Sequence, residues 1–175
     1  DWIEMESGIT DTLWGIWGVS DNQIYAVGDC GLLYYDGSKW TEVENIAYTN
    51  LKDVWGFDSN NIFVAGHGGT VLRYNGDNWL ELYNAPGFGW TYSIWACSES
   101  DIYVGGRGEM LHYDGSSWNH IEFDPSLNVS GIFSIWGSSC NNIYAVGDGG
   151  TFIHYDGVQW EKVENIPSAS YYDVW

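Results

Sequence analysis

Two series of tryptophans recur along the chain at nearly constant spacing, and this repetition limits the fold more than any other feature. The first series sits in segments such as Val54-Trp55-Gly56, and the second lies three residues after an Asp-Gly or Asn-Gly pair in four copies. Within each series, successive tryptophans are 38–42 residues apart. The first series is Trp17, Trp55, Trp95, Trp136 and Trp175, and the second is Trp2, Trp40, Trp79, Trp118 and Trp160.

Each repeat has the pattern of four short strands. The second is an apolar run such as Ile62–Gly66, and an unbroken run of this kind predicts a strand that is buried on both faces. Gly-rich corners and the Asp-Gly or Asn-Gly pairs are typical hairpin connections. The fourth strand starts at a tryptophan of the second series and turns polar, as expected of an outer edge. A period of about 40 residues with this content is typical of propeller blades, so we predict an all-β fold, a β-propeller with four complete four-stranded antiparallel blades.

The two ends of the chain fall at different points of the repeat. Trp2 matches the fourth strand and Trp175 the first, so we predict unmatched terminal strands, an N-terminal D strand and a C-terminal A strand. Two explanations remain open: the chain is part of a larger propeller, which we favour, or these strands pair with further copies in an assembly. The predicted organisation is one propeller unit over 1–175, with repeats at 13–50, 51–91, 92–131 and 132–170 and partial strands at 1–7 and 171–175.

The charge excludes several classes of partner. The formal net charge is -19 with only five Lys and Arg residues, and such a surface repels nucleic-acid phosphates and anionic membranes. No apolar run approaches the roughly 20 residues of a membrane-spanning helix. We therefore predict no nucleic-acid binding and no membrane insertion. The acidic composition suits an extracellular or cell-surface protein whose signal segment is not present in this chain.

The three cysteines are Cys30, Cys97 and Cys140, at repeat positions that form no metal-binding pattern. Cys97 and Cys140 both follow a tryptophan of the first series in neighbouring repeats, which leaves a disulfide open. We favour the simpler interpretation, in which each replaces a small turn residue. We predict no metal and no cofactor.

No arrangement typical of catalysis emerges from the sequence. Acidic pairs are inevitable among 24 Asp and Glu residues, so they do not by themselves indicate a glycosidase. His112 and His154 share one strand position that Tyr34 and Arg73 fill elsewhere, which indicates packing, and no G-x-S-x-G segment is present. We therefore predict that the chain is not an enzyme.

Candidate binding residues gather in loops that a propeller places on one face, where the D–A connections and B–C corners emerge. Loops on a rigid scaffold commonly carry binding residues. Trp90 is the strongest candidate because it lies outside both tryptophan series, and an exposed Trp stacks on sugars or anchors protein partners. The alternative is that Phe88 and Trp90 fold back over a blade end. The candidates are Phe88, Trp90, Asp29, His67, Arg107, Asp148 and Asn128.

The whole chain resembles the bacterial secreted β-propeller repeats that read VWG, ND, VYAVG, DGGT, HYDG and W, relatives of WD40-like, BNR-type and photosystem-assembly-factor propellers. Matching segments include Val54–Gly56 and Ile143–Tyr155. Tyr113–Trp118 also resembles the Asp-box of sialidases, but the spacing from Asp114 to Trp118 departs from that motif. Tachylectin-type lectin propellers are a looser resemblance. The resemblance implies long secreted or surface proteins and no single function.

We expect a non-catalytic propeller scaffold for protein–protein interaction or self-assembly, at the cell surface or outside the cell. Its partners would be a protein or further copies of the chain joined through the terminal strands. Two alternatives remain: a carbohydrate-binding, lectin-like propeller that takes a glycan, and the scaffold part of a secreted hydrolase. Asn128-Val129-Ser130 is a glycosylation acceptor only in a eukaryotic secretory setting.

Overall fold

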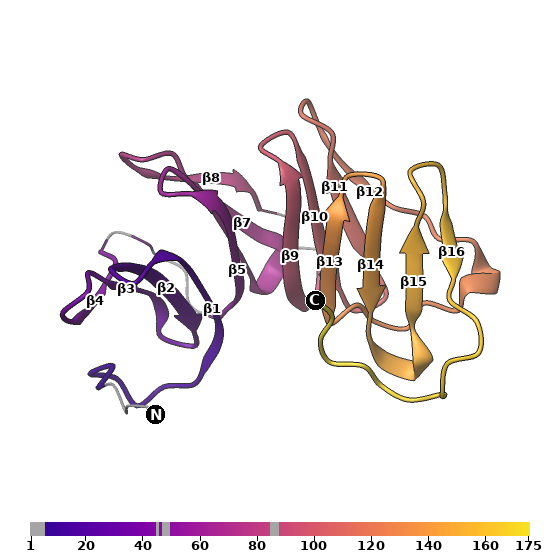
Figure 1. Cartoon of the computed structure of the whole chain (residues 1–175), viewed down its shortest axis with the longest axis horizontal. Helices are drawn as coiled ribbons and strands as arrows, with labels where there is room; N and C mark the ends of the chain where they lie inside the picture. Colours follow the sequence, from indigo (N-terminus) through magenta and orange to yellow (C-terminus); the bar gives the residue numbers. More distant parts are fainter. Residues whose placement is uncertain (1–5, 45, 47–49, 85–87) are drawn as a thin grey trace. The chain divides into compact units, whose positions relative to one another are not determined.

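The computed structural model describes residues 6–44, 46, 50–84 and 88–175, and its regular structure is almost entirely β-strand (Figure 1). The strands form four sheets of four, which we call blades 1 to 4. Three-residue 3₁₀ turns occur at η1 (His67–Gly69), η2 (Pro125–Leu127) and η3 (Asp148–Gly150). The strands are, in blade 1, β1 Leu13–Ser20, β2 Gln23–Gly28, β3 Gly31–Tyr35 and β4 Trp40–Glu42; in blade 2, β5 Leu51–Asp58, β6 Asn61–Gly66, β7 Thr70–Tyr74 and β8 Trp79–Tyr83; in blade 3, β9 Thr91–Ser98, β10 Asp101–Gly106, β11 Met110–Tyr113 and β12 Trp118–His120; and in blade 4, β13 Ser134–Ser139, β14 Asn142–Val146, β15 Phe152–Tyr155 and β16 Trp160–Lys162.

Every blade is an antiparallel meander in which each strand pairs with the next one in sequence. The register is the same in all four blades: the first-series tryptophan lies opposite an aromatic residue of the second strand. The pairs are Trp17 with Tyr25, Trp55 with Phe63, Trp95 with Tyr103 and Trp136 with Tyr144. The prediction of four complete four-stranded blades is therefore confirmed.

Two compact units hold these blades, residues 1–84 with blades 1 and 2 and residues 85–175 with blades 3 and 4. That all 175 residues form one propeller unit stays a prediction. Within the described residues, no helix has the length and hydropathy needed to cross a membrane.

The core of each unit is built from the second and third strands of its blades. Val27, Ile62 and Val64 in the first unit, and Ile102 and Ile143 in the second, are fully buried. The unbroken apolar runs are thus covered on both faces, as the sequence predicts for strands sandwiched between neighbouring blades.

Within each unit, the two blades meet where a tryptophan of one first strand lies over a glycine of the other first strand. A Cβ added to Gly56 would come within 2.5–2.9 Å of the Trp17 indole, and a Cβ on Gly137 would come within 2.8 Å of the Trp95 indole. A side chain at either glycine would push the tryptophan out of its place. The contact between tryptophan and glycine therefore sets the spacing of the two blades within each unit.

The corner between the third and fourth strands is built on an Asp or Asn side chain. In blade 1, Asp36 Oδ1 accepts the backbone N–H groups of Ser38 and Lys39 at 2.8 and 2.9 Å. Gly37 follows with φ +91°, a left-handed conformation that favours glycine. Asn75 accepts the same two bonds in blade 2 at 3.0 and 2.9 Å. The predicted hairpins are present, and a side chain that caps the turn explains why the corner uses Asp or Asn.

The segment 171–175 takes the place of a first strand beside blade 4, although it forms no ladder. The Tyr171 N–H donates to the Gly147 carbonyl oxygen at 2.9 Å, as Ile132 does to Gly106 at 2.8 Å one blade earlier. The Val174 N–H donates to Ser134 Oγ at 3.3 Å. The predicted C-terminal A strand therefore lies where a first strand would lie beside blade 4, but no strand pairs with it among the residues that the structure describes. The predicted N-terminal strand at 1–7 lies mostly outside the described residues.

We predict that Gly56→Ala destabilises the protein by about 1–3 kcal/mol, because the new methyl group overpacks the contact with Trp17. Urea unfolding followed by tryptophan fluorescence measures this loss. Gly89→Ala is the control, since a Cβ there meets nothing within 4 Å. Equal effects of the two substitutions would contradict the role given to the tryptophan–glycine contact.

The corner aspartates predict a loss of stability in acid. Hydrogen bonds from the Lys39 N–H and then from Ser38 hold the pKa of Asp36 at about 2, and bonds led by the Ser116 hydroxyl and by the Gln159 N–H lower the pKa of Asp114 and Asp156. Because these folded pKa values lie below the unfolded value of about 3.9, the stabilisation is complete above about pH 4 and is lost as the pH falls through the folded values.

We therefore expect the triple variant Asp36→Asn, Asp114→Asn, Asp156→Asn to lose less stability than the parent protein between about pH 4 and about pH 2. Asparagine cannot titrate, and Asn75 already fills this role in blade 2. The measurement is urea unfolding across that pH range. The reverse variant Asn75→Asp should steepen the loss, and parallel curves for all three proteins would refute the assignment.

Candidate functional site

The candidate loop residues of the first unit are Asp29 and His67. Asp29 Oδ1 accepts a bond from the Trp14 indole N–H at 2.7 Å and pairs with the Lys52 ammonium at 3.3 Å. The Trp14 bond and then Lys52 lower the pKa of Asp29. The Lys52 ammonium also lies 4.0 Å from the centre of the Trp14 ring. Asp29 therefore serves an internal contact, whereas His67 is exposed in η1.

Phe88 and Trp90, the aromatic candidates of the second unit, differ in their exposure to solvent. Phe88 is only 3% exposed and packs against His120, with 5.9 Å between ring centres. It covers the Gly106 corner, where an added Cβ would meet its ring at 3.0 Å. Trp90 remains 46% exposed. Phe88 thus closes a blade end, and Trp90 alone of the two offers its ring to solvent.

Asp148, Arg107 and Asn128 surround the corners of blades 3 and 4. Asp148 Oδ1 accepts the Ser170 hydroxyl at 2.7 Å and the Gly149 N–H at 2.8 Å. These two bonds, with a smaller electrostatic contribution from Arg107, lower the pKa of Asp148. Asn128 lines a separate polar hollow of about 200 Å³. The structure brings Arg107 near Asp148, while Asn128 belongs to the neighbouring hollow.

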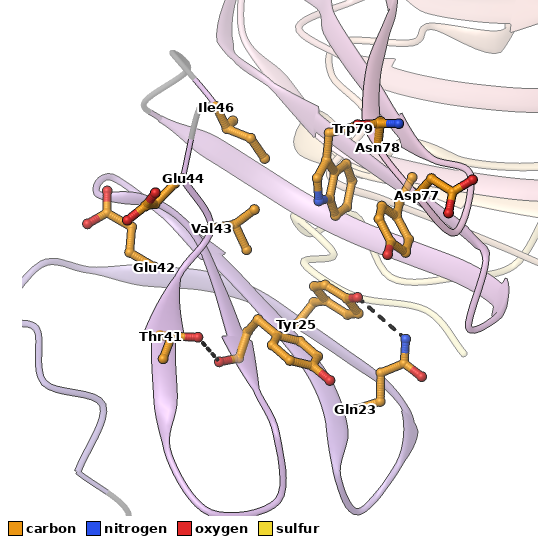
Figure 2. A pocket seen from close by; sticks show the side chains of 12 residues that line it. Gln23, Tyr25, Thr41, Glu42, Val43, Glu44, Ile46, Asp77, Asn78 and Trp79 are labelled. Atoms are coloured by element: carbon orange, nitrogen blue, oxygen red, sulfur yellow. Dashed lines mark hydrogen bonds between the residues drawn. The ribbon is translucent and has the colours of Figure 1, made fainter.

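A larger groove lies between blades 1 and 2, and we call it the blade 1–2 groove. Its volume is about 600 Å³. Figure 2 shows Val43 and Ile46, which both follow the fourth strand of blade 1, projecting toward Trp79 of blade 2. The lining divides into an aromatic group, Tyr25, Tyr34, Tyr74 and Trp79, and an acidic group, Glu42, Glu44 and Asp77, with Gln23, Thr41, Val43, Ile46 and Asn78 between them.

The aromatic group is tightly interlocked. The ring centre of Tyr25 lies 5.1 Å from that of Tyr34 and 5.9 Å from that of Trp79, in an edge-to-face arrangement, and Tyr74 is 5.3 Å from Trp79. Tyr25 is 5% exposed, and burial raises the pKa of its hydroxyl while a bond from Gln23 opposes the rise. The Tyr74 hydroxyl donates to the Gly76 carbonyl oxygen at 2.6 Å. The floor of the groove is therefore a fixed set of rings.

The charged lining of the groove is of one sign. Glu42, Glu44 and Asp77 are exposed at its rim, and the lining residues that the structure describes include no Lys, Arg or His. In blade 4 the repeat position of Glu42 holds Lys162, and that of Asp77 holds Val158. Glu42 and Asp77 therefore differ from their equivalents in blade 4, whereas the position of Glu44 is acidic there as well, as Glu164.

The sequence did not single out this groove, because Tyr25 and Trp79 occupy positions that recur in the other repeats. They do pack: Tyr103 and Trp160 make the equivalent edge-to-face contact in the second unit at 6.4 Å. There, however, Phe123 adds its ring 6.0 Å from Trp160. The same repeat position in blade 1 is Asn45, which lies outside the described residues. This substitution, next to the acidic Glu42–Glu44 run, was the available signal.

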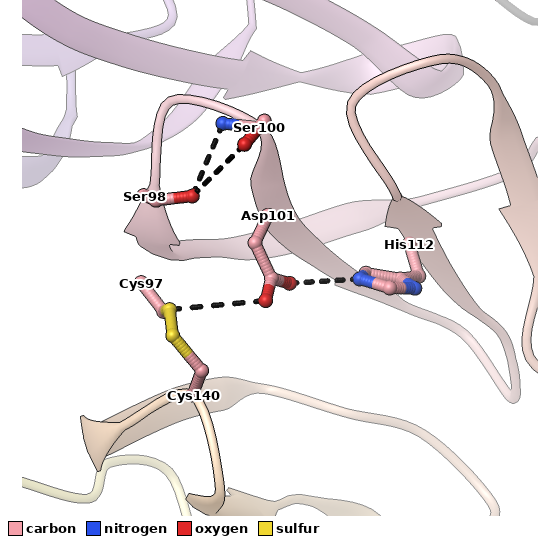
Figure 3. The surroundings of a disulfide bond; sticks show 6 residues. All are labelled: Cys97, Ser98, Ser100, Asp101, His112 and Cys140. Carbon is pink, nitrogen blue, oxygen red and sulfur yellow. Dashed lines mark hydrogen bonds and ion pairs between the residues drawn. A yellow bond between two sulfur atoms is a disulfide. The ribbon is translucent and has the colours of Figure 1, made fainter.

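A disulfide joins Cys97 to Cys140, with 5.2 Å between the two Cα atoms (Figure 3). Our preference for unpaired turn cysteines is therefore wrong. Cys97 lies near the end of β9 and Cys140 directly after β13, and because these two first strands run side by side, the two cysteines come into bonding range. Cys30 is the free cysteine.

The surroundings of the disulfide include two polar side chains. Asp101 Oδ2 lies 3.7 Å from Cys97 Sγ, and Asp101 Oδ1 is 2.8 Å from His112 Nε2. One atom each from Cys97, Cys140 and Asp101 lie within 4.8 Å of one another, a spacing that suits a metal ion. Because the two sulfurs bond to each other, they offer no thiolate ligands, and the cluster acts as a covalent link between blades 3 and 4.

We predict that reducing this disulfide lowers the free energy of unfolding by about 2–4 kcal/mol, since it closes a loop with a sequence separation of 43. Urea unfolding with and without dithiothreitol measures the difference, and Cys97→Ser should reproduce it. Cys30→Ser should leave stability nearly unchanged. Thiol titration of the unfolded, unreduced protein should find one thiol, and a count of three would disprove the link.

No protein-family model matches the chain. No curated protein matches it either. Several solved structures are similar to the chain. YCF48 from Cyanidioschyzon merolae is 19% identical with a TM-score of 0.67, over 91% of this chain and 58% of that one. YCF48 bound to D1 peptide is 17% identical with a TM-score of 0.66, over 91% and 56%.

The extracellular domain of the hybrid two-component system BT4673 from B. thetaiotaomicron is 14% identical with a TM-score of 0.73, over 99% of this chain and 26% of that one. This chain therefore spans little more than half of the YCF48 chains and about a quarter of the BT4673 extracellular domain. At these identities the likeness concerns the fold alone. Together with the four blades and their repeated register, it establishes that the chain folds as blades of a β-propeller.

Proposed function

We propose that this chain is a non-catalytic propeller scaffold that binds a segment of a protein partner in the blade 1–2 groove. The groove itself carries the proposal. Its volume of about 600 Å³ falls within the range of roughly 300–1,000 Å³ that is common for binding pockets. Its aromatic group consists of tyrosine and tryptophan, residue types that are enriched at protein interfaces.

The fixed geometry of the aromatic group supports binding with little loss of side-chain conformational entropy. Tyr25 is buried and Tyr74 is held by its bond to the Gly76 carbonyl, so these rings need no ordering when a partner arrives. A partner segment would insert one or two side chains between Val43 and Trp79. That YCF48 has been solved with D1 peptide supports a protein-partner role for a fold of this kind.

The proposal includes an extracellular or cell-surface setting and membership of the bacterial secreted type of propeller repeat. A disulfide between Cys97 and Cys140 suits an oxidising compartment. Trp90, with Arg107 and Asp148, stays a predicted second contact surface. Assembly with further copies through the terminal segments and a role as the scaffold of a secreted hydrolase also stay predictions.

Carbohydrate binding is the competing function at the same groove, since aromatic rings beside Gln23 and Asn78 also suit a sugar. A single experiment separates the two. A random peptide library displayed on phage is selected on the immobilised protein, and the same protein is applied to a glycan array. We expect enriched peptides and no glycan signal.

The groove is tested by filling it. Val43→Trp should reduce the affinity of the enriched peptides about tenfold or more by occupying the space opposite Trp79. Val163→Trp, at the same repeat position in blade 4, is the matched control and should leave affinity unchanged. Peptides that bind the Val43→Trp variant as well as the parent, an unsuccessful selection, or binding of glycans alone would each overturn the proposal.

A further inference from the structure

We propose that the reduced form of the protein binds Zn²⁺ at the turns that follow the first strands of blades 3 and 4, through the thiolates of Cys97 and Cys140 and the Asp101 carboxylate. In the oxidised form the two sulfurs are bonded to each other, so the site exists only when the disulfide is open. The proposal is independent of the blade 1–2 groove, since all three residues lie in the second unit. It revises our sequence-based prediction of no metal, which considered only the positions of the cysteines along the chain.

The three donor groups lie at distances that suit a tetrahedral zinc ion. One ligand atom from each residue lies within 4.8 Å of the other two, and Asp101 Oδ2 is 3.7 Å from Cys97 Sγ. Zinc bonds of about 2.3 Å to sulfur and about 2.1 Å to oxygen place two such ligands about 3.6 Å apart. Two thiolates and a carboxylate favour Zn²⁺ over Mg²⁺ and Ca²⁺, which prefer oxygen ligands alone. A water molecule completes the fourth position.

Opening the site requires only that the two sulfurs separate. The Cα atoms of Cys97 and Cys140 are 5.2 Å apart, and two sulfurs bound to one zinc ion are about 3.8 Å apart, a separation that rotation of the side chains supplies. Cys140 is exposed, and Cys97 and Asp101 are half-buried, so a reductant and a hydrated metal ion can both reach the site.

The exchange between the two forms balances with a dithiol as the reductant. The dithiol transfers two electrons and two protons to the Cys97–Cys140 bond, which becomes two thiols, while the reductant becomes a disulfide. Zn²⁺ then replaces the two thiol protons, which pass to solvent. The metal and the S–S bond therefore compete for the same two sulfur atoms.

A histidine orients the Asp101 carboxylate toward the sulfur. Figure 3 shows one carboxylate oxygen directed at His112 and the other at Cys97. The first oxygen lies 2.8 Å from His112 Nε2, and the His112 ring stacks on Tyr103 with 4.4 Å between the ring centres. A ligand that is itself hydrogen-bonded to a fixed neighbour is held in position for the metal. His112 is therefore a positioning residue, and the carboxylate is the ligand.

Comparison of the four blades indicates that the carboxylate has a use beyond this hydrogen bond. The position of Asp101 holds an amide in the other three blades, as Gln23, Asn61 and Asn142. In blade 4, Asn142 Oδ1 lies 2.6 Å from His154 Nε2, which is the same pairing with an amide. An amide is thus sufficient for the contact between the second and third strands, and blade 3 has an acid where cysteine sulfurs lie beside it.

The experiment uses the full chain with Cys30→Ser, which leaves Cys97 and Cys140 as the only cysteines. The protein is reduced with dithiothreitol, the reductant is removed by gel filtration in the absence of oxygen, and Co²⁺ is added as the probe. Tetrahedral Co²⁺ with thiolate ligands absorbs visible light, whereas Zn²⁺ does not. We expect one Co²⁺ per chain, displaced by an equal amount of Zn²⁺, and no such absorption from the oxidised protein.

Variants then identify the third ligand. Asp101→Asn recreates the amide–histidine pair of blade 4 and should weaken Zn²⁺ binding about tenfold or more, measured by competition with a chromophoric chelator. His112→Phe keeps a ring beside Tyr103 and removes the bond to Asp101, so we expect a loss of about tenfold with the form of the Co²⁺ spectrum unchanged. The matched control Glu99→Gln removes a carboxylate of the same turn that is outside the ligand group, and it should change affinity less than about twofold.

Three outcomes would overturn the proposal. A reduced protein that gives no Co²⁺ absorption, whether folded or unfolded by tryptophan fluorescence, has no such site. Equal affinities of the parent and Asp101→Asn would mean that the thiols bind metal without the acid. Equal losses in Asp101→Asn and Glu99→Gln would assign the effect to the negative charge of the turn. Peptide binding in the blade 1–2 groove is measured on the oxidised protein, so each of these results leaves the proposed function standing.

Discussion

The contact of a tryptophan with a glycine of the next blade is the interaction on which the rest of the structure depends. Trp17 over Gly56 and Trp95 over Gly137 repeat the same close approach in each unit. This contact brings the first strands side by side, so that Ile135 of blade 4 can donate its N–H to Ser93 of blade 3 at 3.1 Å. Everything farther out along the blades, including the bridging of Cys97 and Cys140, follows from that fixed spacing.

The groove is a consequence of the same geometry at the outer end of the blades. Two sheets that are in contact at their first strands diverge toward their fourth strands. The size of the side chains there determines how much of the space between the sheets is filled. In the second unit Phe123 packs against Trp160 there. In the first unit Val43 and Trp79 face each other across about 600 Å³. The corresponding spaces in the two units therefore differ in the described residues that line them.

The sequence was sufficient for features that repeat, and insufficient for features that depend on how repeats differ. The spacing of Trp17 and its equivalents predicted the four blades, and the apolar runs around Val27 and Ile62 predicted the buried strands. The disulfide was misjudged because its likelihood depends on the distance between neighbouring first strands, which no spacing along the chain reports. Phe88 could not be told from Trp90, since both lie in one loop and only packing against Gly106 buries the first.

The residues of the groove could not be found by a search that excludes packing residues. Tyr25 and Trp79 stabilise the contact between blades 1 and 2 and at the same time form the wall of the groove, so one residue serves both purposes. A change in either ring would alter the fold as well as the site. The exposed residues around these rings can change without cost to the blade contact, and among them Glu42 and Asp77 differ from their equivalents in blades 3 and 4. In such a scaffold the exposed residues around a repeated set of rings can vary from blade to blade, and a search for function should begin where the repeats differ.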